Sequence, residues 1–193
     1  VEHVDLDLDS LSLRAVHGSR VLLTCGSARV VSGLRELDLT SGALIDIRLD
    51  LEVIPPDAFL PDAEAVTVSG VRDVHSFVYR PRNPDYSAPT GELPPFIAVV
   101  HGGPTARHSP ELNLNYAFFT SRGIGIIDIN YGGSSGYGRK YREQLNGQWG
   151  IVDVEDTIAA ISGLADAGIA DPARRRGGRR PRVLGGCAAP GGR

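Results

Sequence analysis

The alternation of apolar and polar residues near the start of the chain predicts short antiparallel strands. In the run 35–39 (RELDL) every second residue is apolar, as expected for a strand with one buried face. The turn at 40–42 (TSG) ends in a glycine, which tolerates the positive φ of a tight hairpin. Regular short strands of this kind are typical of a sandwich, a barrel or propeller blades. The strands expected here are residues 11–16, 21–25, 34–39 and 43–49.

The pattern changes after Pro55, Pro56 and Pro61, because proline discourages a continuing sheet. Beyond them, apolar strands without polar alternation occur between helices, which indicates a parallel sheet covered on both faces and an α/β fold class. The expected strands are residues 65–68, 74–79, 95–100 and 124–129. The expected helices are residues 111–122, 139–145 and 152–167. In the last helix the apolar stripe is expected on Val154, Ile158, Ile161 and Ala165.

The composition is that of an ordinary globular chain, since 41% of the 193 residues are hydrophobic and 22% are charged. This length suffices for one domain or for parts of two. No apolar run approaches the roughly 18 residues of a membrane helix, and no secretory leader opens the sequence. The chain begins at Val1 and holds no methionine, so we expect the true start of the protein to be missing. We expect a cytoplasmic location.

Charge is distributed unevenly along the chain. Residues 171–193 hold seven arginines and one acid, whereas the whole chain has a net charge of −3, so the preceding part is acidic. The two cysteines, Cys25 and Cys187, do not indicate a disulfide framework. Cys25 is expected to be a small buried residue in a strand.

Residues 101–104 (HGGP) directly follow the apolar strand 95–100. Glycines at this place let backbone N–H groups approach a ligand closely, because no side chain intervenes. In α/β-hydrolases the loop after the third strand has this chemistry, and one of its N–H groups binds the oxyanion of the tetrahedral intermediate. The tetrapeptide alone is equally compatible with a plain turn between a strand and a loop, so both interpretations stay open.

Residues 132–136 (GGSSG) match the G-x-S-x-G pattern of a nucleophile elbow, with Ser134 at its centre. An elbow belongs after the fifth strand of the hydrolase sheet, whereas this segment follows the strand next after the glycine loop. We therefore interpret it as a connecting loop. Asp153 and Asp156 are interpreted as caps of the helix that begins near them. His75 and His108 show no partner and no metal spacing, so we expect surface or loop histidines.

Three blocks occur in order: 94–105 (PPFIAVVHGGPT), 130–139 (NYGGSSGYGR) and 147–156 (GQWGIVDVED). Together they resemble the prolyl oligopeptidase family of serine peptidases, especially its acylaminoacyl-peptidase and dipeptidyl-peptidase-like members. With the adjoining residues, the resemblance extends over 61–172.

The resemblance implies a β-propeller followed by an α/β-hydrolase domain. Residues 1–60 would be the end of the propeller, 61–172 the N-terminal part of the hydrolase domain, and 173–193 an Arg/Gly-rich tail that is aberrant or disordered. It also implies a serine peptidase that hydrolyses short peptides at aminoacyl or acylaminoacyl bonds, with no metal or organic cofactor. His101, Gly102 and Gly103 would line the oxyanion hole, and His101 stands where many relatives have a tyrosine.

After residue 172 the sequence departs from the family. The family continues into a fifth strand and a Gly-x-Ser-x-Gly-Gly elbow, with the triad Asp and His further on, and none of these is recognisable here. Gly186-Cys187-Ala188 is a faint match to an elbow and lies several residues too late. A frameshifted end explains the tail better than a basic arm for nucleic acid or another polyanion. We expect a truncated fragment that is inactive alone and does not bind nucleic acid or a membrane.

Two other functions stay open at this point. One is a non-catalytic fragment, or a peptide-binding relic with a basic polyanion-binding tail, and the other is an esterase or lipase on the same fold. The missing fifth strand also predicts that strand 96–100 has a bare edge and that Ile126, Ile127 and Phe119 are poorly covered. On that basis the chain is not expected to fold as a stable monomer.

Overall fold

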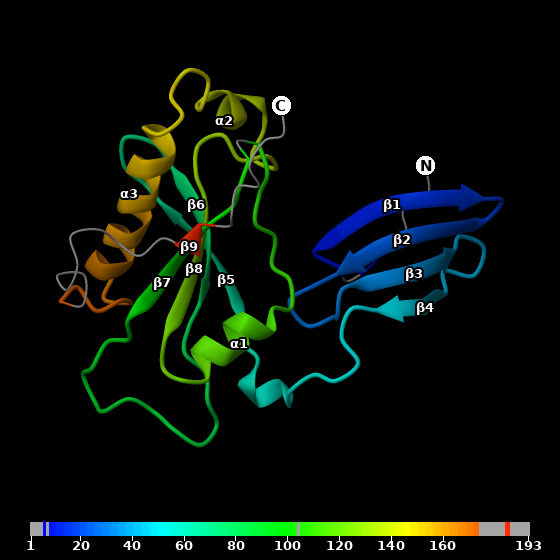
Figure 1. The fold of residues 1–193 in the computed structure, drawn as a ribbon, viewed down its shortest axis with the longest axis horizontal. Helices are drawn as coiled ribbons and strands as arrows, with labels where there is room; N and C mark the ends of the chain where they lie inside the picture. Colours follow the sequence, from blue (N-terminus) through cyan, green and yellow to red (C-terminus); the bar gives the residue numbers. More distant parts are fainter. Residues whose placement is uncertain (1–5, 7, 104, 174–183, 186–193) are drawn as a thin grey trace, which may run out of the picture.

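The computed structural model of the chain describes residue 6 and residues 8–103, 105–173 and 184–185. Its first part is an antiparallel sheet of four strands in the order β1-β2-β3-β4 (Figure 1). These strands are β1 (Ser10–His17), β2 (Arg20–Gly26), β3 (Gly33–Asp38) and β4 (Leu44–Leu49). The predicted alternation is confirmed in β3, where every second residue is buried. The small core of this sheet is formed by Val21, Leu23, Cys25 and Leu37.

The second part is a mixed sheet of five strands in the order β5-β6-β8-β7-β9. Its strands are β5 (Ala63–Val68), β6 (Val74–Tyr79), β7 (Phe96–Val100), β8 (Gly125–Asn130) and β9 (Leu184–Gly185). β5, β6 and β8 pair antiparallel, whereas β7 is parallel to both β8 and β9. Every residue of β8 is buried, which explains why its sequence shows no polar alternation.

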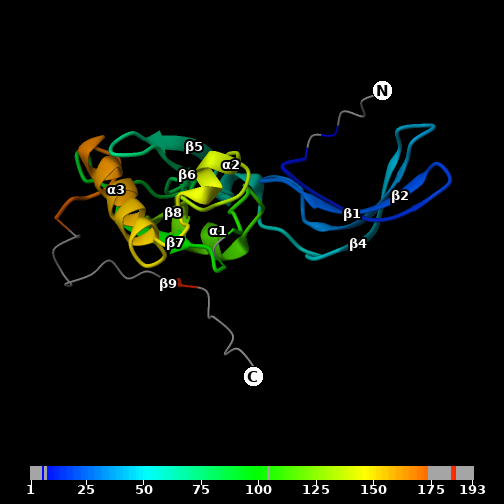
Figure 2. The same cartoon turned by 90° about the horizontal axis from the view of Figure 1, so that it is seen from above.

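The helical segments are η1 (Asp57–Phe59), α1 (Leu114–Thr120), α2 (Arg139–Glu143) and α3 (Val152–Asp166) (Figure 2). Ile127 and Ile129 of β8 pack in one cluster with residues of α3, whereas Asp128 between them contacts Tyr116 of α1. Since successive residues of a strand point to opposite faces, α1 and α3 cover opposite faces of the sheet. The expected coverage on both faces is therefore confirmed.

Two expectations for the helices are wrong in detail. The helix expected at 111–122 begins only at Leu114, because the Asn113 side chain caps it by accepting a hydrogen bond from the Asn115 N–H at 2.9 Å. In α3, Val154 and Ile158 are half-exposed rather than part of the packing stripe. The buried face is instead formed by Val152, Asp156, Thr157, Ala160 and Leu164. The stripe was misplaced because a charged residue, Asp156, occupies its centre.

The expected bare edge of strand 96–100 is partly covered in the structure. β9 pairs in parallel with Val99 and Val100, although no strand was expected after residue 172. The expectation that Ile126 and Ile127 are poorly covered is wrong, because they are 1% and 0% exposed between β6, β7 and the helices. The arginine-rich run 174–182 and the segment Gly186-Cys187-Ala188 lie outside the described residues. The division at residues 60 and 172 stays a prediction.

A chain of ion pairs connects the two sheets through the segment that joins them. Arg29, in the β2–β3 loop, pairs with Asp57 at 2.7 Å and with Asp62, and it also donates to the Leu60 carbonyl at 3.2 Å. Arg82, after β6, pairs with the other oxygen of Asp62 at 2.5 Å. Two arginines from segments distant in sequence therefore bind the two carboxylates of the segment that joins the sheets. Among the described residues, no helix has the length and apolar character to cross a membrane.

Candidate functional site

The glycine loop, residues 101–103, leaves the carboxyl end of β7. Gly102 and Gly103 are exposed, and Gly103 has a φ of +72°, a left-handed conformation that favours glycine. Apart from the chain neighbours, no heavy atom of the described residues lies within 4 Å of the place where a Cβ would stand on either glycine. Within the part of the chain that the structure describes, no hydrogen bond is found for the N–H of Gly102 or Gly103. Both donors are therefore open to a ligand.

The His101 side chain is engaged by the segment that follows β8. Its Nε2 atom lies 2.7 Å from Ser134 Oγ, and its ring stacks on Tyr131 with 4.4 Å between the centroids. Ser134 donates its one hydroxyl proton to the Tyr131 carbonyl at 2.7 Å, so the imidazole is the donor in the contact with Ser134. Burial lowers the pKa of His101, which favours the neutral ring.

Ser134 lies in a position unlike that of a nucleophile. Its side chain is 0% exposed, and both of its hydrogen bonds stay inside the protein. A substrate carbonyl has no access to this oxygen, although the pair of Ser134 and His101 resembles a catalytic dyad in distance alone. The geometry agrees with the interpretation of residues 132–136 as a connecting loop.

A buried polar cluster lies next to the glycine loop, on the α1 face of the sheet. Asp128 accepts a hydrogen bond from the Tyr116 hydroxyl at 2.5 Å, and its other oxygen lies 3.7 Å from His108 Nδ1. Burial raises the pKa of Asp128 to about 7 and lowers the pKa of His108 to about 4. His108 lies in a loop, as expected, but it has partners that the sequence did not show, because the loop after residue 104 folds back onto β8.

His75 also has partners, contrary to expectation. Its ring stacks on Tyr137 with 4.2 Å between the centroids, and its Nδ1 lies 3.0 Å from Thr67 Oγ1. The partners of both histidines were missed for the same reason. They lie on other elements, so the sequence around each histidine does not indicate them.

The two acids of α3 have different roles. Asp153 accepts a hydrogen bond from the Gly150 N–H at 2.7 Å, as a capping acid does. Asp156 is 2% exposed, pairs with Arg72 at 2.5 Å and accepts from the Gly132 N–H at 2.7 Å. A Cβ on Gly132 would lie 2.9 Å from Val152 Cγ1 and 3.1 Å from Asp156 Oδ2, so a larger residue would displace these buried side chains. Asp156 therefore holds the loop after β8 rather than the helix end.

Sequence reasoning missed Arg72, Asn130 and Tyr131. The dipeptide Asn130-Tyr131 carried the one available signal, since Asn130 is a polar residue at the end of a strand that is buried throughout and Tyr131 directly follows it. Arg72 had no signal, because it reaches Asp156 across 84 positions of the sequence.

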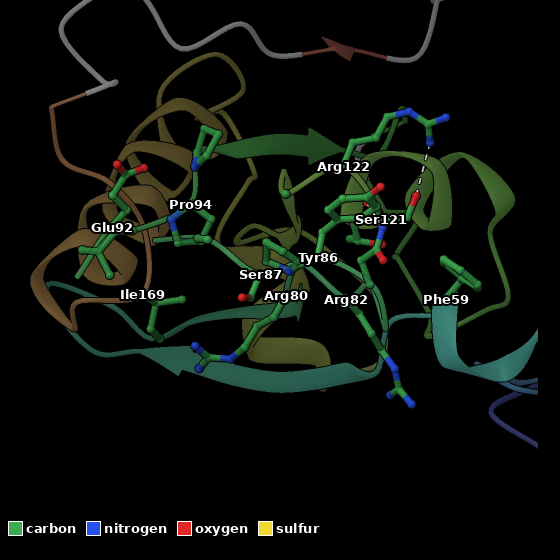
Figure 3. Close-up of a pocket in the computed structure, with 17 residues that line it drawn as sticks. Phe59, Arg80, Arg82, Tyr86, Ser87, Glu92, Pro94, Ser121, Arg122 and Ile169 are labelled. Atoms are coloured by element: carbon green, nitrogen blue, oxygen red, sulfur yellow. Dashed lines mark hydrogen bonds between the residues drawn. The ribbon is translucent and has the colours of Figure 1, made fainter. Parts of the chain in front are cut away.

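The structure also holds a hollow of about 1200 Å³ away from the glycine loop (Figure 3). It is lined by Pro94 and Pro95, which precede β7, and by Gly123, which precedes β8, so it lies at the opposite edge of the sheet. Its three arginines are engaged: Arg80 pairs with Glu64 at 2.9 Å, Arg82 pairs with Asp62, and Arg122 lies 3.7 Å over the Phe118 ring. This hollow is not part of the glycine-loop site.

Residues 110–176 match the sequence profile of the prolyl oligopeptidase family. The match covers about a third of the 193 residues. Among curated proteins, the acylamino-acid-releasing enzyme of Arabidopsis thaliana is 39% identical over 88 residues, which are 46% of this chain and 12% of that protein. The dipeptidyl aminopeptidase BIII of Pseudoxanthomonas mexicana is 31% identical over 75 residues, covering 39% of this chain and 11% of that protein. The chain thus spans about an eighth of the first of these relatives.

Solved structures extend the likeness to most of the chain. A puromycin-hydrolyzing peptidase of Mycobacterium tuberculosis is 45% identical, with a TM-score of 0.84 over 88% of this chain and 27% of that one. A puromycin hydrolase variant complexed with PGG is 41% identical, with a TM-score of 0.80 over 87% of this chain and 26% of that one. The predicted fold class is confirmed: the five-stranded sheet is an N-terminal part of an α/β-hydrolase, and propeller strands precede it.

Proposed function

We propose that this chain carries the oxyanion-binding element of a serine peptidase that hydrolyses short peptides. One observation supports this most directly: Gly102 and Gly103 are exposed at the carboxyl end of β7, and their N–H groups form no hydrogen bond among the described residues. Backbone N–H groups at the carboxyl end of a parallel strand can donate hydrogen bonds to a carbonyl oxygen. They thereby stabilise the negative charge that develops on this oxygen during acyl transfer. The peptide-hydrolysing relatives, one of them solved as a complex with PGG, favour peptides as the substrates.

The side chain of His101 does not contribute to this site in our proposal. Its ring is committed to Ser134 and Tyr131, so the two glycine amides are the donors. We further propose that this chain alone does not hydrolyse peptides. In its sequence, the only serine at the centre of a G-x-S-x-G pattern is Ser134, which is buried.

The oxyanion role is tested by transplanting the loop into an active enzyme. Residues 95–135 would replace the corresponding segment of the puromycin-hydrolyzing peptidase of M. tuberculosis, with which the chain superposes at a TM-score of 0.84. The chimera should hydrolyse puromycin. Substituting Gly103→Val, which strains the φ of +72°, should lower kcat by about 10²–10³ with little change in KM.

Ser134→Ala in the same chimera is the matched control and should leave kcat within about threefold, because Ser134 touches no substrate in our proposal. A Gly103→Val chimera with unchanged kcat would refute the oxyanion role. The inactivity of the unaltered chain is checked with puromycin and with acylaminoacyl and dipeptidyl p-nitroanilides. Turnover by the chain that is lost in Ser134→Ala would identify Ser134 as a nucleophile and contradict the proposal.

A further inference from the structure

The glycine loop lies along the segment 130–135, which contacts it at successive points. The Tyr131 hydroxyl lies 3.2 Å from the His101 carbonyl oxygen and 3.1 Å from that of Gly103. Ser135 donates its N–H to the Ala106 carbonyl at 3.1 Å. Asn130 accepts from the His108 N–H at 2.7 Å and donates to the His108 carbonyl at 3.2 Å, as a neighbouring strand would.

The contact of Tyr131 determines which way the loop amides face. In a trans peptide the C=O of one residue and the N–H of the next point in opposite directions. The His101 carbonyl is turned toward Tyr131, so the Gly102 N–H is turned away from it. Two adjacent glycines otherwise have wide freedom in φ and ψ. The Tyr131 hydroxyl contacts the His101 carbonyl before this pair of glycines and the Gly103 carbonyl at its end. These contacts restrict the φ and ψ angles of the residues between the two carbonyls.

Tyr131 is itself held firmly. Its side chain is 5% exposed, and burial raises the pKa of its hydroxyl, which therefore keeps its proton and remains a donor. The next residue, Gly132, is bonded to the buried carboxylate of Asp156, and Asp156 is paired with Arg72. The position of the hydroxyl is thus fixed by α3 and by the β5–β6 turn.

We propose that Tyr131 is the positioning residue of the glycine loop: its one hydroxyl proton is shared between the His101 and Gly103 carbonyls, and this contact orients the open amide of Gly102 and restricts that of Gly103. Ser134, by contrast, contacts the His101 ring and the Tyr131 carbonyl, and its hydroxyl forms no hydrogen bond with the backbone of residues 101–103 among the described residues. Nothing in the family match or in the names of the relatives assigns a role to Tyr131. The relevance of this role to catalysis rests on the proposed function.

The test uses the whole chain labelled with ¹⁵N-glycine and ¹⁵N-histidine and compares three single variants. Tyr131→Phe removes only the hydroxyl and should shift or broaden the amide signals of Gly102 and Gly103, leaving the helical Gly163 signal in place. Tyr116→Phe removes a tyrosine hydroxyl bonded to Asp128 and should leave the loop signals unchanged. Ser134→Ala should alter the ¹⁵N shifts of the His101 ring and leave the Gly102 and Gly103 amides where they are.

Unchanged Gly102 and Gly103 signals in Tyr131→Phe would overturn the proposal, as would an equal perturbation by Ser134→Ala. Should Tyr131→Phe fail to fold, a crystal structure of the unaltered chain decides the matter. A Tyr131 hydroxyl within about 3.5 Å of both carbonyls supports the proposal, and one beyond that distance from both refutes it. Because the amide signals are read without turnover, an inactive chimera would refute the proposed function and leave the positioning role of Tyr131 intact.

Discussion

The two sheets of this chain differ in how far their apolar faces are covered by other parts of the structure. In the five-stranded sheet, helices of the same chain cover both faces, and β8 is buried along its whole length. In the four-stranded sheet, Leu13 and Val16 of β1 pair directly with the buried Leu23 and Val21 of β2. Yet Leu13 is 60% exposed and Val16 is 59% exposed, so the apolar face continues past its cover.

The difference shows where stability resides in the described residues. The five-stranded sheet has a contiguous core that includes Ile127, Ile129, Ala160 and Leu164, whereas the four-stranded sheet has a cluster of four fully buried apolar residues. A sheet without helices of its own buries its face only against another layer. Substitutions should therefore be costly in the five-stranded sheet and mild on the open face of the other.

The largest effect is expected from Asp156→Ala. It removes the buried partner of Arg72, which then keeps only the exposed Glu155, and it leaves the buried Gly132 N–H without an acceptor, so the free energy of unfolding should fall by about 3–5 kcal/mol. Asp153→Ala, on the same helix, loses one exposed capping bond and should cost about 1 kcal/mol. Urea unfolding followed by the fluorescence of Trp149, the one tryptophan, measures both. Equal losses would show that Asp156 is only a cap.

Ile127→Ala and Ile47→Ala compare the two sheets directly. Ile127 is 0% exposed, and its truncation should cost about 2–5 kcal/mol because a cavity remains in the core. Ile47 is 53% exposed, and its truncation should cost less than about 0.5 kcal/mol. The same unfolding curves, supported by circular dichroism for the β-rich first part, test this. Similar costs at both positions would contradict the contrast drawn between the sheets.

The buried pair of Asp128 and His108 should shape the dependence of stability on pH. The folded pKa of Asp128 is raised from 3.8 to about 7, so its contribution to stability is lost as pH rises through that window. The folded pKa of His108 is lowered from 6.5 to about 4, so its contribution is gained as pH rises from about 4 to 6.5. The two contributions oppose each other in the native chain.

Asp128→Asn removes one side of this balance. The stability of this variant should then rise between pH 4.5 and 6.5 by up to about 3 kcal/mol more than that of the unaltered chain. Urea unfolding at the two pH values, at constant ionic strength, measures the difference. Parallel pH profiles for the two proteins would mean that Asp128 does not keep its proton in the folded chain.

The smallest effect on stability is expected from Leu13→Ser on the open face of β1. Leu13 is 60% exposed, so the free energy of unfolding should change by less than about 0.5 kcal/mol. Self-association should nevertheless decrease, because an exposed apolar sheet face favours contact between molecules. Light scattering at increasing protein concentration tests this, with Ser12→Ala as a neighbouring control. A large loss of stability would contradict this prediction, because it would show that Leu13 is buried against another part of the protein.

Local sequence determined the elements of this protein well. The periodicity of residues 35–39, the apolar runs that became β7 and β8, and the helix that became α3 were all readable, because backbone conformation follows from patterns within a few residues. The position of the glycine loop after β7 followed in the same way. The three ordered blocks between residues 94 and 156 were enough to indicate the family, since their order and spacing persist in the sequence itself.

Only the tertiary structure decided how these elements form the site. The burial of Ser134, the contact of Tyr131 with the His101 and Gly103 carbonyls, and the pairing of Arg72 with Asp156 join residues 28 to 84 positions apart. No local periodicity encodes such contacts, because they depend on the order of strands in the sheet and on which face each helix covers. For the same reason the packing face of α3 was misplaced. Asp156 can be buried there because it pairs with Arg72, which lies on a turn distant in sequence.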